Sequence, residues 1–268
     1  MSPARSHALT RPHSHGSTSR QPFLALDVGN SSVKAAVWDG SWGAVGRFPL
    51  DEAPAAVWAE RLADVARGAR AGGLASVVPT LTPVLAEAVA AVTGAPAVVV
   101  SAALALPFRM AYETPATLGA DRLAAAVGAW ARADGRPVIA LDAGTAITTE
   151  VVSAEPAFLG GAILPGPDLL RRSLARDTRQ LPDVPWPDGL APIGASTAEA
   201  IQAGLGALVL DGVAGLLRRT RAALGGDALV VATGGWGGWL AERLPEIDRV
   251  DPFLVLDGVR ILGAPARR

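Results

Sequence analysis

One short turn near residue 30 combines an acid, a glycine and small polar side chains. It reads Asp27-Val-Gly-Asn-Ser-Ser32 and follows the apolar run Phe23–Leu26. Glycine lets backbone N–H groups approach a ligand closely, and a turn of such groups suits phosphate. Asp27 cannot bind phosphate itself, because both are negative, but it can hold Mg²⁺ through water. We therefore predict a nucleotide phosphate loop made by Gly29, Asn30, Ser31 and Ser32. An ordinary hairpin turn without a ligand is the alternative.

The same pattern returns about half a chain later. Leu141-Asp-Ala-Gly-Thr-Ala146 matches Leu26-Asp-Val-Gly-Asn-Ser31, and each copy lies between two apolar runs. Strand, glycine turn and strand form a β-hairpin. An internal repeat of this kind indicates two similar halves with a cleft between them. The second copy makes phosphate binding the stronger interpretation of both turns.

Two further features join these turns. Lys34, the only lysine of the chain, follows the first turn and could place a point charge on a transferred phosphoryl group. A strand lysine facing solvent is the alternative. A third glycine-rich segment, Ala232-Thr-Gly-Gly-Trp-Gly-Gly238, follows an apolar strand and precedes a short helix. In series with the hairpins, it predicts that Gly234 and Gly235 lie at the nucleoside end of the same site.

Composition excludes several other chemistries. The 268 residues include no cysteine, so disulfides, thiolate nucleophiles and Cys-ligated metals are excluded. All three histidines lie within the first fifteen residues, which argues against a histidine base or metal site. The net charge of −1 gives no electrostatic signature of nucleic acid or an anionic membrane. The segment that comes closest to a membrane-spanning helix, Ile201–Leu217, contains Gln202 and Asp211 and is interpreted as a buried helix.

The elements that must position these groups indicate an α/β protein. Strand-like runs alternate with helical segments, among them Pro54–Ala71, Leu81–Thr93, Asp121–Ala133 and Thr197–Thr220. We predict a disordered tail over residues 1–22, which lack the apolar stretch of a signal peptide. An N-terminal half over 23–134 and a C-terminal half over 135–268 follow, divided at the turn Asp134-Gly-Arg-Pro137. The default location is the cytoplasm.

The ordered motifs resemble a known family. The two hairpins and the late Thr-Gly-Gly are similar to the phosphate loops and adenosine loop of the actin/Hsp70/sugar-kinase superfamily, whose halves are ribonuclease-H-like. Finer motifs resemble type III pantothenate kinase, in its order and approximate spacing. They are Leu118-Gly-Ala-Asp-Arg122 after Tyr112, Gly160-Gly-Ala-Ile-Leu-Pro-Gly166, Thr178-x-x-Leu-Pro182, and Ile193-Gly-Ala-Ser-Thr-Ala-Glu-Ala-Ile201. The resemblance covers Phe23 to about Leu262, nearly the whole folded chain.

The resemblance implies that ATP phosphorylates pantothenate, the first step towards coenzyme A, in a homodimer. It implies that Asp27 to Lys34 and Thr145 bind ATP, and that Asp142 holds a monovalent cation, K⁺ or NH₄⁺, beside the phosphates. It also implies that Asp121 is the general base, and that the pantothenate pocket is lined by Tyr112, Gly119, Ala120, Asp121, Arg122 and Thr197.

The residues themselves agree with these roles. Arg122 can pair with a carboxylate, and Asp121 can accept a hydroxyl proton. In a chain without the other motifs, Asp121 would be an ordinary acid in a helix first turn. Ser31 stands where the family commonly has Thr, and Glu150 stands where Asp is usual. A regulatory homologue that binds nucleotide without turnover, and a kinase for another substrate, are the alternatives.

Overall fold

The computed structural model describes residues 21–187, 189 and 191–264, and the predicted tail falls almost entirely outside them. The first of two sheets has the strand order β3-β2-β1-β4-β5. Its strands are β1 (Phe23–Val28), β2 (Ser32–Trp38), β3 (Gly46–Pro49), β4 (Ala71–Ser76) and β5 (Val98–Val99). Strand β1 runs antiparallel to β2 and parallel to β4.

The second sheet repeats this plan. Its order is β11-β10-β7-β8-β9-β6. The strands are β6 (Arg109–Met110), β7 (Val138–Ala143), β8 (Ala146–Val152), β9 (Ala157–Pro165), β10 (Leu229–Thr233) and β11 (Arg249–Val250). Strand β7 runs antiparallel to β8 and parallel to β10, so β7 corresponds to β1 and β8 to β2. The internal repeat and the predicted fold class of two similar α/β halves are confirmed.

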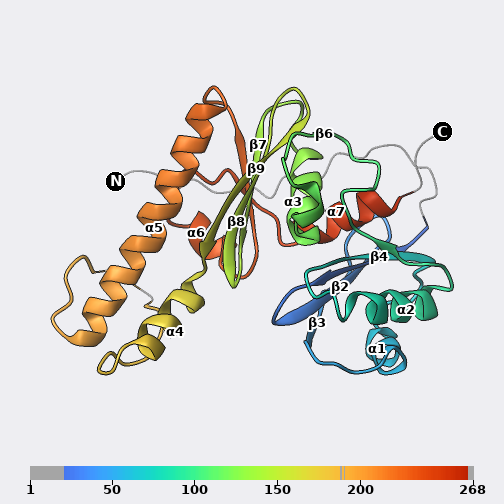
Figure 1. Ribbon diagram of the computed structural model, residues 1–268, viewed down its shortest axis with the longest axis horizontal. Helices are drawn as coiled ribbons and strands as arrows, with labels where there is room; N and C mark the ends of the chain where they lie inside the picture. Colours follow the sequence, from blue (N-terminus) through green and yellow to red (C-terminus); the bar gives the residue numbers. More distant parts are fainter. Residues whose placement is uncertain (1–20, 188, 190, 265–268) are drawn as a thin grey trace, which may run out of the picture.

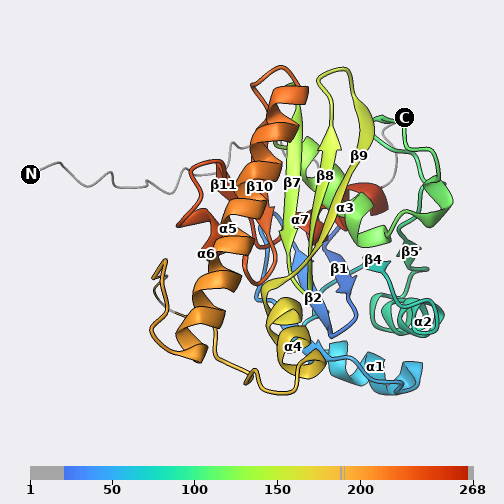
Figure 2. The ribbon, with the colours of Figure 1, turned by 60° about the vertical axis from the view of Figure 1, so that its left-hand side comes forward.

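Helices cover the sheets in three layers (Figures 1 and 2). Helices α1 (Ala55–Leu62) and α2 (Thr82–Thr93) cover the outer face of the first sheet, while α5 (Thr197–Ala223) and α6 (Gly237–Ala241) cover that of the second. Helices α3 (Ala120–Trp130) and α7 (Leu254–Gly263) lie between the two sheets. Helix α4 (Pro167–Asp177) lies beside the start of α5, and a short 3₁₀ turn, Pro115–Thr117, precedes α3.

The central strands are buried on both faces, which explains their continuous apolar sequence. In β1, Leu24 and Leu26 face the outer helices, while Ala25 faces the central layer. In β7, Leu141 faces outward and Ala140 faces the same central layer. The alternation of side chains along each strand therefore divides it between the outer helices and the central layer, where Phe23 and Val138 accompany the alanines.

The central layer is a close crossing of two helices. A Cβ atom at Gly128 of α3 would collide with the carbonyl oxygen of Leu254 in α7. A Cβ atom at Gly258 of α7 would collide with the carbonyl oxygen of Ala124 in α3. Each helix therefore presents a glycine to the backbone of the other. This crossing joins the two sheets and places the start of α3 beside the first hairpin.

Two elements cross the predicted division at residue 134. Strand β6 precedes that position but pairs with β9 in the second sheet. Helix α7 follows that position but packs on β1 and β4 of the first sheet. The division of the chain into halves at this point therefore stays a prediction, although the two sheets themselves lie on either side of it in sequence.

The structure corrects two predicted helices. The sequence predicts one helix from Pro54 to Ala71, but in the structure helix α1 ends at Leu62 and Ala71 begins β4. A helix cannot continue because Gly68 has φ +86° and the next segment joins the sheet. Helix α5 is long and apolar enough to cross a membrane by length and composition, but it packs on the second sheet through Val213 and Leu217. The prediction that this helix is buried holds for one face only, because Leu208 is 57% exposed.

Candidate active site

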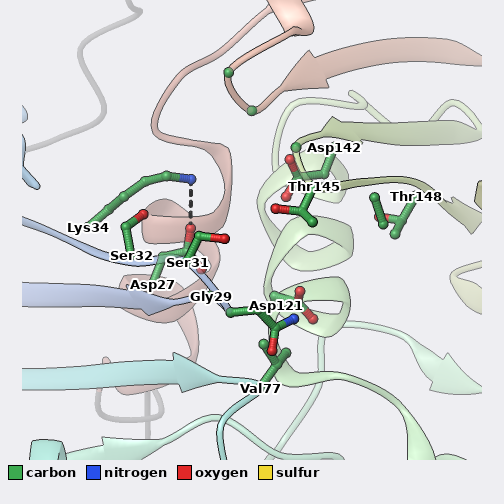
Figure 3. A pocket seen from close by; sticks show the side chains of 15 residues that line it. Asp27, Gly29, Ser31, Ser32, Lys34, Val77, Asp121, Asp142, Thr145 and Thr148 are labelled. Atoms are coloured by element: carbon green, nitrogen blue, oxygen red, sulfur yellow. Dashed lines mark hydrogen bonds and ion pairs between the residues drawn. The ribbon is translucent and has the colours of Figure 1, made fainter. Parts of the chain in front are cut away.

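Each hairpin turn is closed by a hydrogen bond from its glycine, although the first turn is one residue longer than the second. In the first, the N–H of Gly29 donates to the carbonyl of Ser32 at 3.1 Å, and in the second, the N–H of Gly144 donates to the carbonyl of Ala146 at 2.9 Å. The acids that precede them, Asp27 and Asp142, occupy equivalent positions of β1 and β7. The turns of both halves face one cavity (Figure 3).

Lys34 points into this cavity and pairs with the acid of its own hairpin. It lies directly opposite Asp27 in the register of β1 and β2, and its Nζ donates to Asp27 Oδ2 at 3.0 Å (Figure 3). Burial alone would lower the pKa of Lys34, but the charge and hydrogen bond of Asp27, helped by Asp142, raise it. The lysine is therefore charged, and the solvent-facing alternative is not what the structure shows.

Asp142 has no such partner. Thr148 lies opposite it in the register of β7 and β8, at the position that Lys34 occupies in the first hairpin. Desolvation, together with the negative charge of Asp27, raises the pKa of Asp142 to about 7. A carboxylate in this condition is stabilised by any cation that enters the cavity.

The third glycine-rich segment packs directly on the second hairpin. Gly234 has φ +83°, and a Cβ atom there would lie 2.5 Å from Asp142 Oδ1 and from the carbonyl oxygen of Ala143. The N–H of Trp236 donates to that same carbonyl at 2.9 Å. Glycine is required because this turn combines a left-handed backbone with close approach. Gly234 and Gly235 thereby reach the cavity.

Asp121 reaches the cavity from the first turn of α3. Gly119 caps this helix, and the N–H of Arg122 donates to Asp121 Oδ1 at 2.7 Å. Desolvation raises the pKa of Asp121, the negative charge of Asp27 adds to the rise, and the hydrogen bond from Arg122 opposes it. Figure 3 shows the Asp121 carboxylate in the same cavity as the side chains of the two hairpins.

The cavity has a volume of about 220 Å³. All predicted ATP-binding residues line it, together with Asp121 and Asp142. It is lined in addition by Val77, Gly144, Ala146 and Thr148.

 Gly144 and Ala146 belong to the second turn that the sequence already predicts to bind phosphate, whereas Val77 and Thr148 are not predicted from the sequence. A gapless alignment of the two hairpins places Thr149, not Thr148, at the position of Lys34, because the second turn is one residue shorter than the first.

The predicted pantothenate residues fall into two groups. Ala120, Asp121 and Arg122 form the first turn of α3, and Gly119 caps it. Tyr112 lies in the loop after β6, packs edge-on against Phe158 at 5.8 Å between ring centroids, and contacts Arg122. These residues lie together beside the cavity, although Asp121 alone among them lines it.

Thr197 lies elsewhere. It begins α5 and lines a separate, apolar groove of about 360 Å³ between α4 and α5, whose other lining residues are Leu174, Leu181, Ala200, Ile201, Gly204, Leu205 and Leu208. The structure of a single chain therefore does not bring Thr197 to the other predicted pantothenate residues.

Sequence reasoning also missed the role of Glu150 in this region. Glu150 Oε1 accepts a hydrogen bond of 2.7 Å from Arg122 Nε, and its side chain is fully buried. Desolvation raises the pKa of Glu150 to about 7, although Arg122 acts in the opposite direction. The sequence signalled this position only as a departure from the family pattern.

The donor set suits cations that arrive with a nucleotide. Among the residues that the structure describes, no group of three or more acidic or histidine side chains is close enough to hold a metal ion alone. Asp27 and Asp142 nevertheless offer carboxylate oxygens, which Mg²⁺ and K⁺ prefer, at the edge of a cavity made by glycine turns. The residues therefore fit a metal whose remaining ligands are phosphate oxygens and water.

Comparison with known proteins decides the family. The family model for type III pantothenate kinase matches residues 23–219. The chain belongs to the type III pantothenate kinase family. A type III pantothenate kinase of Chlorobaculum parvum is 36% identical over 255 residues, which cover 89% of this chain and 93% of that protein. Another, from Moorella thermoacetica, is 38% identical over 189 residues, covering 70% of this chain and 74% of that protein.

Solved structures agree on the fold of this family member. A protein from Campylobacter jejuni, described as a transcriptional activator of the Baf family, superposes with a TM-score of 0.59 at 20% identity, covering 89% of this chain and 96% of that one. A glucokinase from an Antarctic psychrotroph gives a TM-score of 0.50 at 13% identity, covering 91% and 99%. At these identities the likeness shows the fold alone.

Proposed function

We propose that this member of the type III pantothenate kinase family transfers the γ-phosphoryl group of ATP to the primary hydroxyl of pantothenate. The product would be 4′-phosphopantothenate, the first intermediate towards coenzyme A. The observation that carries the proposal is the single cavity on which both glycine turns, Lys34 and Asp121 converge. Family membership supplies the substrate, and the cavity supplies groups suited to the reaction.

The residues divide the work of phosphoryl transfer. The turns at Gly29 and Gly144 would hold the phosphates through backbone N–H groups, with Lys34 as a point charge. Asp121 would orient the pantothenate hydroxyl and accept its proton as the new O–P bond forms. The bond between the γ-phosphorus and the bridging oxygen breaks, and ADP leaves with that electron pair. Arg122 would bind the pantothenate carboxylate.

Two cations complete this proposal. Mg²⁺, held by ATP and by Asp27 through water, would neutralise phosphate charge as it does in other kinases. A monovalent cation, K⁺ or NH₄⁺, would lie at Asp142. The support for this second site is the carboxylate itself, which has a raised pKa and no basic partner in its own hairpin.

A direct assay tests the proposal. Purified protein is mixed with ATP, Mg²⁺ and pantothenate in K⁺ or in Na⁺, and phosphopantothenate is measured by mass spectrometry. We expect product in K⁺ and much less in Na⁺. ATP binding without product in either salt would contradict the proposal and favour a regulatory homologue. Product from a sugar in place of pantothenate would favour another kinase.

We also propose that the protein acts as a homodimer. The groove between α4 and α5 is apolar and open, and Thr197 lines it. A second copy seated on this groove would cover Leu208, which is 57% exposed, and would carry Thr197 toward a pantothenate pocket. We also propose that the protein is located in the cytoplasm, as expected from the sequence.

The dimer is tested with a matched pair of charged variants. Leu208→Arg places a charge in the groove, whereas Val250→Arg places one at β11, where Val250 is 46% exposed. Light scattering should find a dimer in the wild type and in Val250→Arg, and a monomer with impaired pantothenate binding in Leu208→Arg. A monomeric wild type would refute the proposal.

A further inference from the structure

We propose that Glu150 is a positioning residue that fixes the Arg122 guanidinium for the substrate carboxylate, and that it thereby makes the enzyme select an anionic acceptor. The inference rests on the proposed function, because it concerns the same acceptor. It adds a residue that lies on β8, outside the cavity lining and outside the motif that carries Asp121 and Arg122.

The contact between the two side chains has a defined geometry. Glu150 Oε1 accepts from Arg122 Nε at 2.7 Å, and the side chains are 0% and 10% exposed. A guanidinium is planar, so a partner at Nε determines the direction of the two terminal nitrogens. Those nitrogens are the ones that bind a carboxylate in a two-pronged arrangement. Glu150 therefore fixes the direction of the Arg122 guanidinium through Nε, and a carboxylate ligand would bind at the terminal nitrogens.

The glycine pair Gly160-Gly161 of β9 lets this strand approach β8 and Tyr112 closely. Gly161 lies opposite Glu150 in the register of β8 and β9, and a Cβ atom there would collide with the carbonyl oxygen of Thr149. Gly160 has φ +103°, and a Cβ atom there would lie 3.2 Å from the ring of Tyr112. The motif that begins at Gly160 thus allows Tyr112 to lie against the strand.

Tyr112 contributes the second constraint on Arg122. Its ring packs edge-on against Phe158, and its phenol interacts electrostatically with Arg122. Arg122 is thus held at Nε by Glu150, with Tyr112 beside it. Of its five N–H groups, the remaining ones are available to an incoming acid.

Stability alone does not explain a carboxylate at position 150. The second oxygen, Glu150 Oε2, is buried and has no hydrogen-bond partner in the described structure. Burying an ion pair often contributes less to stability than an apolar pair of similar volume would. A buried acid with one unsatisfied oxygen is therefore better explained by what it does to Arg122.

The experiment compares two acceptors in two variants. Glu150→Met keeps the length of the side chain and removes both carboxylate oxygens. Glu150→Gln keeps one oxygen that can accept a hydrogen bond from Arg122, without the negative charge. The acceptors are pantothenate and panthenol, which carries a hydroxymethyl group in place of the carboxylate. The measured quantity is the ratio of kcat/KM for pantothenate to kcat/KM for panthenol.

We expect the ratio to fall about tenfold or more in Glu150→Met, because an unpositioned arginine discriminates poorly. The fall should come from a raised KM for pantothenate, with KM for ATP unchanged. Glu150→Gln should lie between the wild type and Glu150→Met. An equal loss with both acceptors, or an unchanged ratio in both variants, would overturn the inference.

A matched control separates positioning from buried charge in general. Glu246 also pairs with an arginine, Arg218, at 2.7 Å, and its Oε2 is also buried without a partner. It lies outside the proposed site, so Glu246→Met should leave the acceptor ratio at the wild-type value. A wild type that phosphorylates neither acceptor would refute the proposed function itself, whereas a normal wild type with an unchanged variant ratio would refute the role of Glu150 alone.

Discussion

The two hairpins of the molecule follow the same plan, but the first turn is one residue longer and a different residue faces the acid in each. Asp27 lies opposite Lys34 in the first, and Asp142 lies opposite Thr148 in the second. The first hairpin therefore carries its own counter-charge, and the second carries a bare carboxylate whose pKa is raised to about 7. One half of a duplicated site is neutralised internally, and the other half is suited to a cation from solution.

The elements that follow the hairpins differ as well. Between β3 and β4 the first half has the short helix α1, whereas between β9 and β10 the second half has α4 and the 27-residue helix α5. In the second half, α4 and α5 form an apolar groove. The duplication supplies two phosphate loops, and the differences supply the proposed cation site and dimer surface.

We expect the largest effect on kcat from Asp121, which belongs to neither hairpin. Asp121 comes from α3, between the sheets, so Asp121→Asn should lower kcat by about 10²–10⁴-fold, in the range of general-base catalysis. The hairpins are untouched, so ATP affinity measured by calorimetry should stay near the wild-type value.

Asp134→Asn is the control for this variant. It removes an acid just beyond the same helix, and its φ of +50° is one that asparagine tolerates. We expect normal turnover. Near-normal turnover in Asp121→Asn would instead show that the base lies within a hairpin.

The next largest effect concerns the junction of the halves. Gly258→Ala would force a methyl group against the carbonyl of Ala124 and should destabilise the protein by about 1–3 kcal/mol, as overpacking does. Gly212→Ala in α5 meets no atom within 4 Å and should be neutral or stabilising by up to about 1 kcal/mol. Urea unfolding measures both. Equal stabilities would show that the halves are not held together at this crossing.

The hairpins could be predicted from the sequence because each consists of an aspartate-glycine turn between two apolar runs, all within a few neighbouring residues. It predicted Asp121 through the motif around it. It could not predict the contact of Arg122 with Glu150, since 28 residues separate them and the contact depends on how α3 meets β8. The end of α1 at Leu62 was missed for a similar reason, because pairing of β4 with β1 overrides the helical pattern. Thr197 was grouped with Arg122 by motif, and the single chain separates them.

A smaller effect is expected from the charge of the first hairpin. Lys34→Met removes the point charge from the cavity and leaves Asp27 without its partner, so ATP would meet an uncompensated carboxylate. Loss of one hydrogen bond to a charged group should raise KM for ATP about 10–100-fold. Lys34→Arg keeps the charge and should lose less. An unchanged KM in Lys34→Met would mean that the lysine serves Asp27 alone.

The smallest effect is also the sharpest test of the comparison between the hairpins. Thr148→Lys would give the second hairpin the arrangement of the first, with an ammonium opposite Asp142. An adjacent positive charge lowers the pKa of a carboxylate, so the pKa of Asp142 should fall from about 7 toward its ordinary range. The side-chain ammonium of the variant would then occupy the place proposed for K⁺. The site would need no ion from solution, so the ratio of activity in K⁺ to activity in Na⁺ should fall to about one. Thr148→Val, which has a similar shape and no charge, should retain the K⁺ dependence. If Thr148→Lys is active and still requires K⁺, the bare carboxylate of the second hairpin is not the cation site, and the difference between the two halves has another purpose.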